Sequence, residues 1–425
     1  MLANPHPLLL RTSLALALVF GFSLGLYLVV GFAFGLPLSA STPVLMQLHG
    51  QMQALGLVGL FIMAVGVQLF PRFHVSRLDR PWLVSIGGLV VAAGLLMRAF
   101  TQPLVPQDAT RGVGLVTSGL LELVGFAVAV YAFARVIRGS VQPRPRGTAR
   151  LLPATMGGSL LLALGLNVYA CVGLARGALV VPFVQDEALL HLELWGFAST
   201  MVLAVAGRIF PRFLLLQPTR ERLVPYALVL WAVGSFGLPV VWLALGGAAL
   251  PRTAAALAQL AGACLYVLAL RLYEAPVRAS GMPHVTDPTR RWARLAFALM
   301  LMAAAANVGL AAADAAGLPS ATTGLSAARH ALAQGFLLPV IVVMSARILP
   351  GYSGYMLHRP RLLGVLVWTM LLGAALRFGG EFLGGYAPGW GAIVALGGSL
   401  GVASFVIFAI GLWRATGRPP ALDSG

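Results

Sequence analysis

The stretch "HGQMQALGLVGLFIMAVGVQLFPRF" at residues 49–73 is a long apolar segment with a histidine at its start and a proline and an arginine near its end. Two later stretches share this plan: "HLELWGFASTMVLAVAGRIFPRF" at 191–213 and "HALAQGFLLPVIVVMSARILPGY" at 330–352. About 20 apolar residues in a helix cross roughly 30 Å of hydrocarbon. Each stretch therefore predicts one membrane-spanning helix.

The composition places the whole chain in a membrane. Of its 425 residues, 59% are hydrophobic and 10% charged, and the mean hydropathy is +0.89, which excludes an ordinary soluble domain. The pattern predicts an all-α protein with one membrane domain, 1–425, since almost nothing remains for a soluble one. The expected spans are 12–36, 44–70, 82–100, 114–137, 154–174, 188–210, 224–247, 253–273, 293–315, 327–349, 361–378 and 389–413.

The net charge of +17 comes entirely from arginine and follows the predicted topology. Loops after the even-numbered helices hold most of the arginines, whereas the opposite side holds Arg98, Arg111, Arg176, Arg252, Arg329 and Arg377. By the positive-inside rule, both termini are expected to be cytoplasmic. The charge distribution indicates orientation in a lipid bilayer, and we expect no nucleic-acid partner.

Aligning the three opening stretches on Pro71, Pro211 and Pro350 reveals an internal repeat. A glycine lies fifteen residues before each proline, and Gln51, His191 and His330 lie twenty residues before it. The period of about 140 residues equals four helices, so we expect three parallel pseudo-repeats, at about 1–150, 151–291 and 292–425. Inverted repeats, common in transporters, do not give this arrangement.

His49, His191 and His330 are expected at one depth, in the outer third of the bilayer. A histidine in hydrocarbon is costly unless its ring nitrogens find partners, so each is a functional candidate, or else a hydrogen-bonded core residue. Imidazole suits iron and copper. The three residues are therefore predicted metal ligands, with His49 and His330 as axial ligands of one haem.

Other polar groups in the predicted spans have open roles. Arg329, Arg98 and Arg377 could pair with haem propionates, or could be helix-end residues that reach toward water. Glu122 and Glu193 are either proton relays or locally hydrogen-bonded neutral acids. Two sets complete the candidates: Met46 and Met52 as soft copper ligands or packing residues, and Asn167, Asn307 and Asp314 as interhelical hydrogen-bonding residues.

Twelve helices with histidines on helices 2, 6 and 10 resemble the catalytic subunit of haem-copper oxidases. The length and the 49–73 stretch are more similar to the NnrS family, twelve-helix haem- and copper-containing membrane proteins of the bacterial nitric oxide response. The resemblance implies His49 and His330 as ligands of a low-spin haem and puts His191 on the helix that supplies a copper ligand in oxidases. The stretch at 224–247 lacks the adjacent histidine pair of the oxidase copper site. Gln51 and Met52 replace the second histidine and the glutamate of the family's His-x-His-Glu motif.

The sequence thus predicts a bacterial inner-membrane protein with a haem, expected to be b-type, copper as a second metal, nitric oxide as a gaseous ligand and an electron donor as a partner. Whether it is an enzyme is left open. Three alternatives remain: a proton-coupled transporter using His191, Glu193 and Glu122, a divergent oxidase-like electron-transfer subunit, and a cofactor-free scaffold.

Overall fold

The computed structural model describes residues 5–105, 107–141, 147–277, 288–318, 322–353, 360–384, 387 and 389–416. These residues form helices and no strand. The α-helices are α1 (Pro5–Leu16), α2 (Ser23–Phe34), α3 (Thr42–Gln51), α4 (Leu60–His74), α5 (Pro81–Leu104), α6 (Ala109–Arg138), α7 (Leu151–Ala175), α8 (Phe183–His191), α9 (Thr200–Phe213), α10 (Val224–Leu245), α11 (Ala249–Leu270), α12 (Thr289–Ala315), α13 (Thr322–Leu332), α14 (Leu338–Ser353), α15 (Pro360–Leu383) and α16 (Trp390–Ala415).

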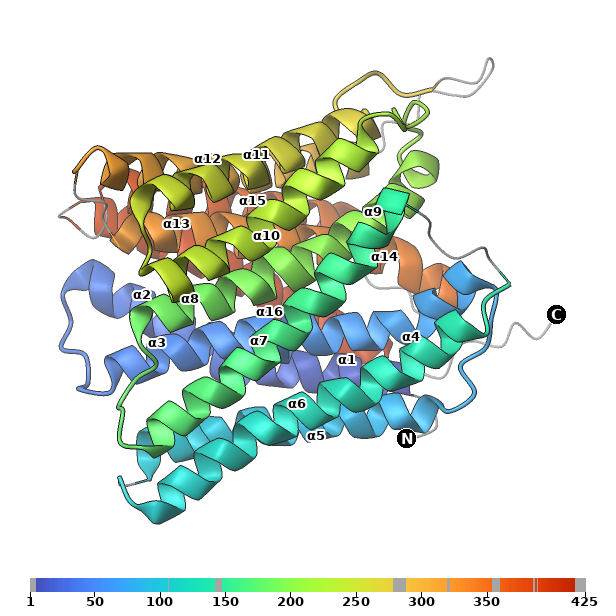
Figure 1. Ribbon diagram of the computed structural model, residues 1–425. Coiled ribbons are helices and arrows are strands. Elements are labelled where there is room, and N and C mark those ends of the chain that lie inside the picture. The colour runs from blue at the N-terminus through green and yellow to red at the C-terminus, as the bar shows by residue number, and fades with distance from the viewer. Residues whose placement is uncertain are drawn as a thin grey trace.

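Four π-helical segments join α-helices end to end: η1 (Ala17–Phe22), η2 (Met52–Gly59), η4 (Leu192–Ser199) and η5 (Ala333–Leu337), while η3 (Gly147–Arg150) is a short 3₁₀ turn. The joined elements give twelve helices of 22 to 33 residues that are long and apolar enough to cross a membrane. The predicted number of spans is confirmed for the described residues. Figure 1 shows the helices side by side along one common direction.

Three of the twelve spans form the interior of the bundle. These inner helices are α3–η2–α4, α8–η4–α9 and α13–η5–α14, the helices of the three repeated stretches. In the most apolar 18-residue stretch of these helices, 67%, 83% and 78% of the residues are buried, against 33–56% in the other nine spans. The outer nine helices therefore carry the lipid-facing surface. We call the two ends of the inner helices the histidine end and the proline end.

The outer helices pack closely in hairpins because glycines face each other. A Cβ added to Gly87 on α5 would lie 2.6 Å from the carbonyl oxygen of Gly125 on α6. The same relation joins Gly373 on α15 to Gly397 on α16, at 2.7 Å, and on α11 a Cβ at Gly262 would lie 2.5 Å from the backbone nitrogen of Trp231 on α10. Small residues let helix backbones touch, the usual packing mode where hydrocarbon surrounds the protein.

Helix boundaries differ from the predictions where polar residues are paired within a helix. Helix α5 runs to Leu104 because Arg98 Nε donates to Gln102 Oε1 at 3.2 Å. Likewise α15 runs to Leu383, where Arg377 Nε donates to Glu381 Oε1 at 3.0 Å. The prolines also do not end the helices: α4 continues three residues beyond Pro71. A proline in the last turn removes few hydrogen bonds.

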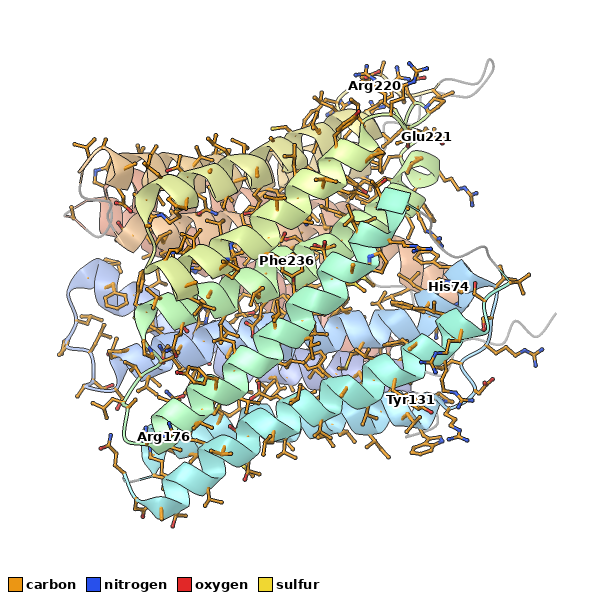
Figure 2. All side chains as sticks on the ribbon, viewed as in Figure 1. His74, Tyr131, Arg176, Arg220, Glu221 and Phe236 are labelled. Carbon is orange, nitrogen blue, oxygen red and sulfur yellow. The ribbon has the colours of Figure 1, made fainter. Side chains whose placement is uncertain are left out.

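The first and last helices meet at one face of the bundle, where Arg11 Nε donates to Thr416 Oγ1 at 3.2 Å. Residues 1–4 and 417–425 lie outside the described residues, so the predicted cytoplasmic termini stay a prediction. Figure 2 shows His74, Arg220 and Glu221 at the proline end of the bundle and Arg176 at the opposite end.

Candidate functional site

Each inner helix carries a π-helical segment at nearly the same place. Segments η2 and η4 begin nineteen residues before Pro71 and Pro211 and end twelve before them, and η5 lies within the same window before Pro350. A π turn inserts an extra residue, widens the helix and redirects the side chains next to it, and such turns occur frequently at functional sites. The segments follow directly after Gln51 and His191 and closely after His330.

His49 is fixed by the first membrane span. Its Nδ1 lies 2.8 Å from the carbonyl oxygen of Gly21 in η1. On the next turn of that span, a Cβ added to Gly25 would lie 2.6 Å from Cε1 of the ring. Glycine at this position leaves the room that the imidazole occupies, so the ring is held against the span by a hydrogen bond and by shape.

His330 on α13 is held in a comparable way. Its Nδ1 lies 2.8 Å from the carbonyl oxygen of Ser326, one turn earlier, and 3.3 Å from Oε2 of Glu381 on α15. Glu381 is fully buried and also accepts the hydrogen bond from Arg377. A buried carboxylate thus sits between an imidazole and a guanidinium. Such a partner orients a ring and raises the basicity of its other nitrogen.

The hydrogen bonds determine which nitrogen of each ring is free. A backbone carbonyl only accepts, so Nδ1 carries the proton in both His49 and His330. In a neutral ring Nε2 then has a free lone pair, the form that binds a metal. Neither Nε2 has a hydrogen-bond partner among the described residues.

The charges around the two histidines influence each other. His49 lies within electrostatic range of His330, Arg329 and Arg377. The side chain of His330 keeps 21% of its exposure although its helix is an inner one, which indicates space beside the ring. Two imidazoles with free Nε2 atoms and adjacent arginines are residues that fit a haem with two axial histidines.

The predicted propionate partners differ in their surroundings. The Arg329 guanidinium forms an ion pair with Glu187 of α8 at 3.1 Å, and Arg377 pairs with Glu381. Arg98 is only 2% exposed and bonds to Gln102 and Asn167 in another part of the bundle. Only Arg329 and Arg377 therefore remain candidates for contact with a haem at His49 and His330.

His191 lies apart from this pair. Its ring faces Trp195 and Trp242, with ring centroids 6.1 and 5.6 Å away, and its Nε2 lies 3.5 Å from Nε2 of Gln259 on α11. The structure places His191 in an aromatic pocket between α8, α10 and α11. Its predicted role as a metal ligand stays a prediction.

A second buried polar cluster joins four helices around Asn167 of α7. The Asn167 side chain accepts from Arg98 Nη1 at 2.6 Å and from Gln51 Nε2 at 3.2 Å, and it donates to Glu122 Oε2 at 2.9 Å. Gln51, Arg98, Asn167 and Glu122 are all at most 2% exposed. We call these four residues the Asn167 network. The expected interhelical role of Asn167 agrees with this geometry.

Glu193 of η4 lies at the edge of the Asn167 network. It is 1% exposed and within electrostatic range of Glu122, Arg98 and Asp186, and the Gln51 side chain lies close to its carboxyl. Neither carboxyl oxygen makes a hydrogen bond of normal geometry with a described residue.

Sequence reasoning missed Glu381, Glu187 and the role of Gln51. Glu381 had a detectable signal, because an arginine four residues before a glutamate in an apolar helix is the spacing of an ion pair. Glu187 had none, since its partner Arg329 is 142 residues away in the chain. Of the methionines, Met46 is 49% exposed and Met52 is in the core, beside Gly56.

Within the described residues, no three or more His, Cys, Asp or Glu side chains gather in a way that could hold a metal ion. A haem with two histidine ligands does not need such a group, whereas a copper centre with three protein ligands does. No protein-family model and no curated protein matches the chain. The resemblance to the NnrS family therefore stays a prediction, and the plain conclusion is a helical protein with twelve candidate membrane spans.

Proposed function

We propose that the protein binds a haem between α3 and α13, with His49 and His330 as the axial ligands. The observation that supports this most directly is the tautomer of both rings: each Nδ1 is bound to a carbonyl, and each Nε2 is free. Glu381 then acts as the partner that orients His330, and Gly25 gives His49 its room. Arg329 and Arg377 supply positive charge for the propionates.

The wider proposal is a multi-pass protein of the bacterial inner membrane, built from three parallel four-helix repeats, that handles nitric oxide by binding, sensing or redox conversion. When bound, a haem supplies one-electron transfer if both axial positions are filled and gas binding if one is open. The positions of the His49 and His330 rings would determine whether both axial positions of the haem are filled or one is open. The common window of the π segments supports the repeat assignment.

The absorption spectrum of detergent-purified protein tests this proposal. Protein expressed with ample haem is expected to show a Soret band that shifts on reduction with dithionite. The band should be lost or strongly altered in His49→Ala and in His330→Ala. The matched control is His74→Ala, a histidine at the proline end that contacts Ser140. A well-folded wild type without a Soret band would refute the haem proposal.

A second candidate function, proton-coupled transport, is supported by Glu193. A carboxyl that is 1% exposed, and for which the described residues provide no hydrogen bond of normal geometry, is more stable as a neutral acid than as an anion. We expect infrared spectra of the wild type to contain the carbonyl band of a protonated carboxylic acid that is absent in Glu193→Gln. Glu221→Gln, on the exposed surface, is the control. If the same substitution also stops substrate-driven proton uptake in liposomes, transport becomes the better function.

A further inference from the structure

The inner helices line an apolar cavity of about 80 Å³ that is partly open. It lies between α4, α9 and α14, in the half of the bundle toward the proline end. Its lining residues are Phe61, Ile62, Val65 and Leu69 from α4, Met201, Val202, Val205, Ala206 and Phe210 from α9, and Val340, Ile341, Met344, Ser345 and Leu349 from α14.

The lining positions are equivalent in the three helices. Counted back from Pro71, Pro211 and Pro350, the residues at ten, nine and six positions line the cavity in all three cases. The three residues nine positions before the prolines, for example, are Ile62, Val202 and Ile341. The cavity therefore lies where the three inner helices face one another.

The chemistry of the lining selects against water. A buried water needs two to four polar partners, and the only hydroxyl in the lining is that of Ser345. Ser345 is 3% exposed, and its Oγ has no hydrogen-bond partner among the described residues. The Oγ atom is itself buried and offers almost no polar surface to the space, so the lining fits an uncharged and apolar ligand.

The size of the cavity limits the ligand further. An engineered apolar cavity of about 150 Å³ stays dry and binds benzene or xenon. The present cavity has roughly half that volume. It has room for one atom or for a molecule of two or three atoms, and it is too small for a ring. Met201 and Met344 can adjust the wall, because unbranched methionine side chains fit irregular shapes.

We propose that this cavity is a binding site for one small uncharged gas molecule, held by contact with the apolar side chains of the lining. The site is separate from the histidines, since Phe61 lies twelve residues beyond His49, about 18 Å along the helix. The proposal does not depend on the haem.

Xenon is the probe, because it is apolar, of suitable size and visible by anomalous scattering. Crystals of the wild type under xenon pressure are expected to show a peak between Ile62, Val202 and Ile341. Val205→Phe fills the cavity and should remove that peak. Val233→Phe, the same substitution at a lipid-facing position of α10 that is 50% exposed, should leave it.

Three results would overturn the proposal: a wild type with xenon sites elsewhere and none here, a peak that persists in Val205→Phe, or a peak that also disappears in Val233→Phe. If Val205→Phe does not fold, Ala206→Leu fills the same space with fewer atoms. A filled cavity should also leave the melting temperature unchanged or raise it, because no packed atom is displaced. A clear fall in both filling variants would show that the space is already occupied by side chains.

Discussion

Replacing Asn167 by leucine should destabilise the protein more than any other single change to an uncharged polar residue that we can identify in the described chain. Leucine has nearly the shape of asparagine, so the substitution removes hydrogen bonds while leaving little empty space. The Asn167 side chain makes three such bonds, to Arg98, Gln51 and Glu122. The substitution removes the side-chain hydrogen bonds that join α7 to α3, α5 and α6.

The magnitude follows from two scales. Interhelical hydrogen bonds in a membrane protein average about 0.6 kcal/mol, so three of them give about 2 kcal/mol. The bond to Glu122 involves an ionisable group, and this carboxyl, which is fully buried and cannot reach water, adds about 1–3 kcal/mol when it loses its amide partner. Arg98 keeps its hydrogen bond to Gln102 and adds no such cost. We expect Asn167→Leu to lower the free energy of unfolding by about 3–5 kcal/mol.

Reversible unfolding in mixed micelles with increasing fractions of dodecyl sulfate measures this difference. Asn307→Leu on α12 is the control, because Asn307 is only partly buried and makes no side-chain hydrogen bond to a described residue. It should change stability by at most about 0.5 kcal/mol. A cost below about 1 kcal/mol for Asn167→Leu, or equal costs for the two variants, would refute the reasoning.

Three further predictions concern other parts of the molecule. Removing the carboxylate beside His330 with Glu381→Gln should raise the reduction potential of a bound haem, because a nearby negative charge favours the ferric state; a redox titration with the exposed Glu221→Gln as control checks this. Gly125→Val should separate α5 from α6 and cost about 1–3 kcal/mol or more, whereas Gly165→Val, with nothing within 4 Å of its added Cβ, should be tolerated in the same unfolding assay. The hydrogen bond from Arg271 lowers the pKa of the Glu274 carboxyl, which also pairs with Arg220. Because the pKa of Glu274 is lowered, the stabilisation from its contacts with Arg271 and Arg220 is complete above the ordinary carboxyl pKa. That stabilisation is lost as the pH falls through the lowered pKa. Exchange protection of the Val277 amide, which bonds to Leu215, should therefore fall at acidic pH in the wild type and be low at every pH in Glu274→Gln.

The fold was predictable as far as it depends on apolar length. Twelve spans could be found in the sequence because each must supply enough apolar residues to cross the bilayer, whatever its neighbours are. The helices α5 and α15 extend beyond the predicted spans because their last turns contain Arg98, Gln102, Arg377 and Glu381, which raise the local polarity. Those side chains pair within the helix, and the pairing depends on side-chain geometry that a hydropathy average does not record.

The site was predictable only in part. Regular spacing from the three prolines identified His330 and His191, and it showed that Gln51 occupies the equivalent position in the first repeat. It could not reveal that His49 contacts Gly21, or that Glu187 reaches Arg329, since both contacts depend on how distant helices pack. The π segments were also missed, because a π turn has no strong sequence signal of its own and is set by the side chains around it.

The ionisable residues of the histidine half point to one residue that separates the two candidate functions. That half holds six arginines (Arg98, Arg111, Arg176, Arg252, Arg329 and Arg377) and seven acids (Asp108, Glu122, Asp186, Glu187, Glu193, Asp314 and Glu381), so it is close to neutral although the chain carries +17. Most of the deeply placed acids are matched: Glu187 with Arg329, Glu381 with Arg377, Asp314 with Arg252, and Glu122 with Arg98 through Asn167.

Glu193 has no such match among the described residues, and Arg98, the arginine whose charge reaches it, is already engaged. Any negative charge that enters this half, as an electron on a haem or as a transported anion, meets in Glu193 a carboxyl able to exchange a proton in compensation. In an electron-transfer protein, Glu193→Gln should leave haem content unchanged and remove the pH dependence of the potential. In a transporter, the same substitution should uncouple transport from protons. One variant therefore distinguishes the two functions through residues that the fold has already placed together.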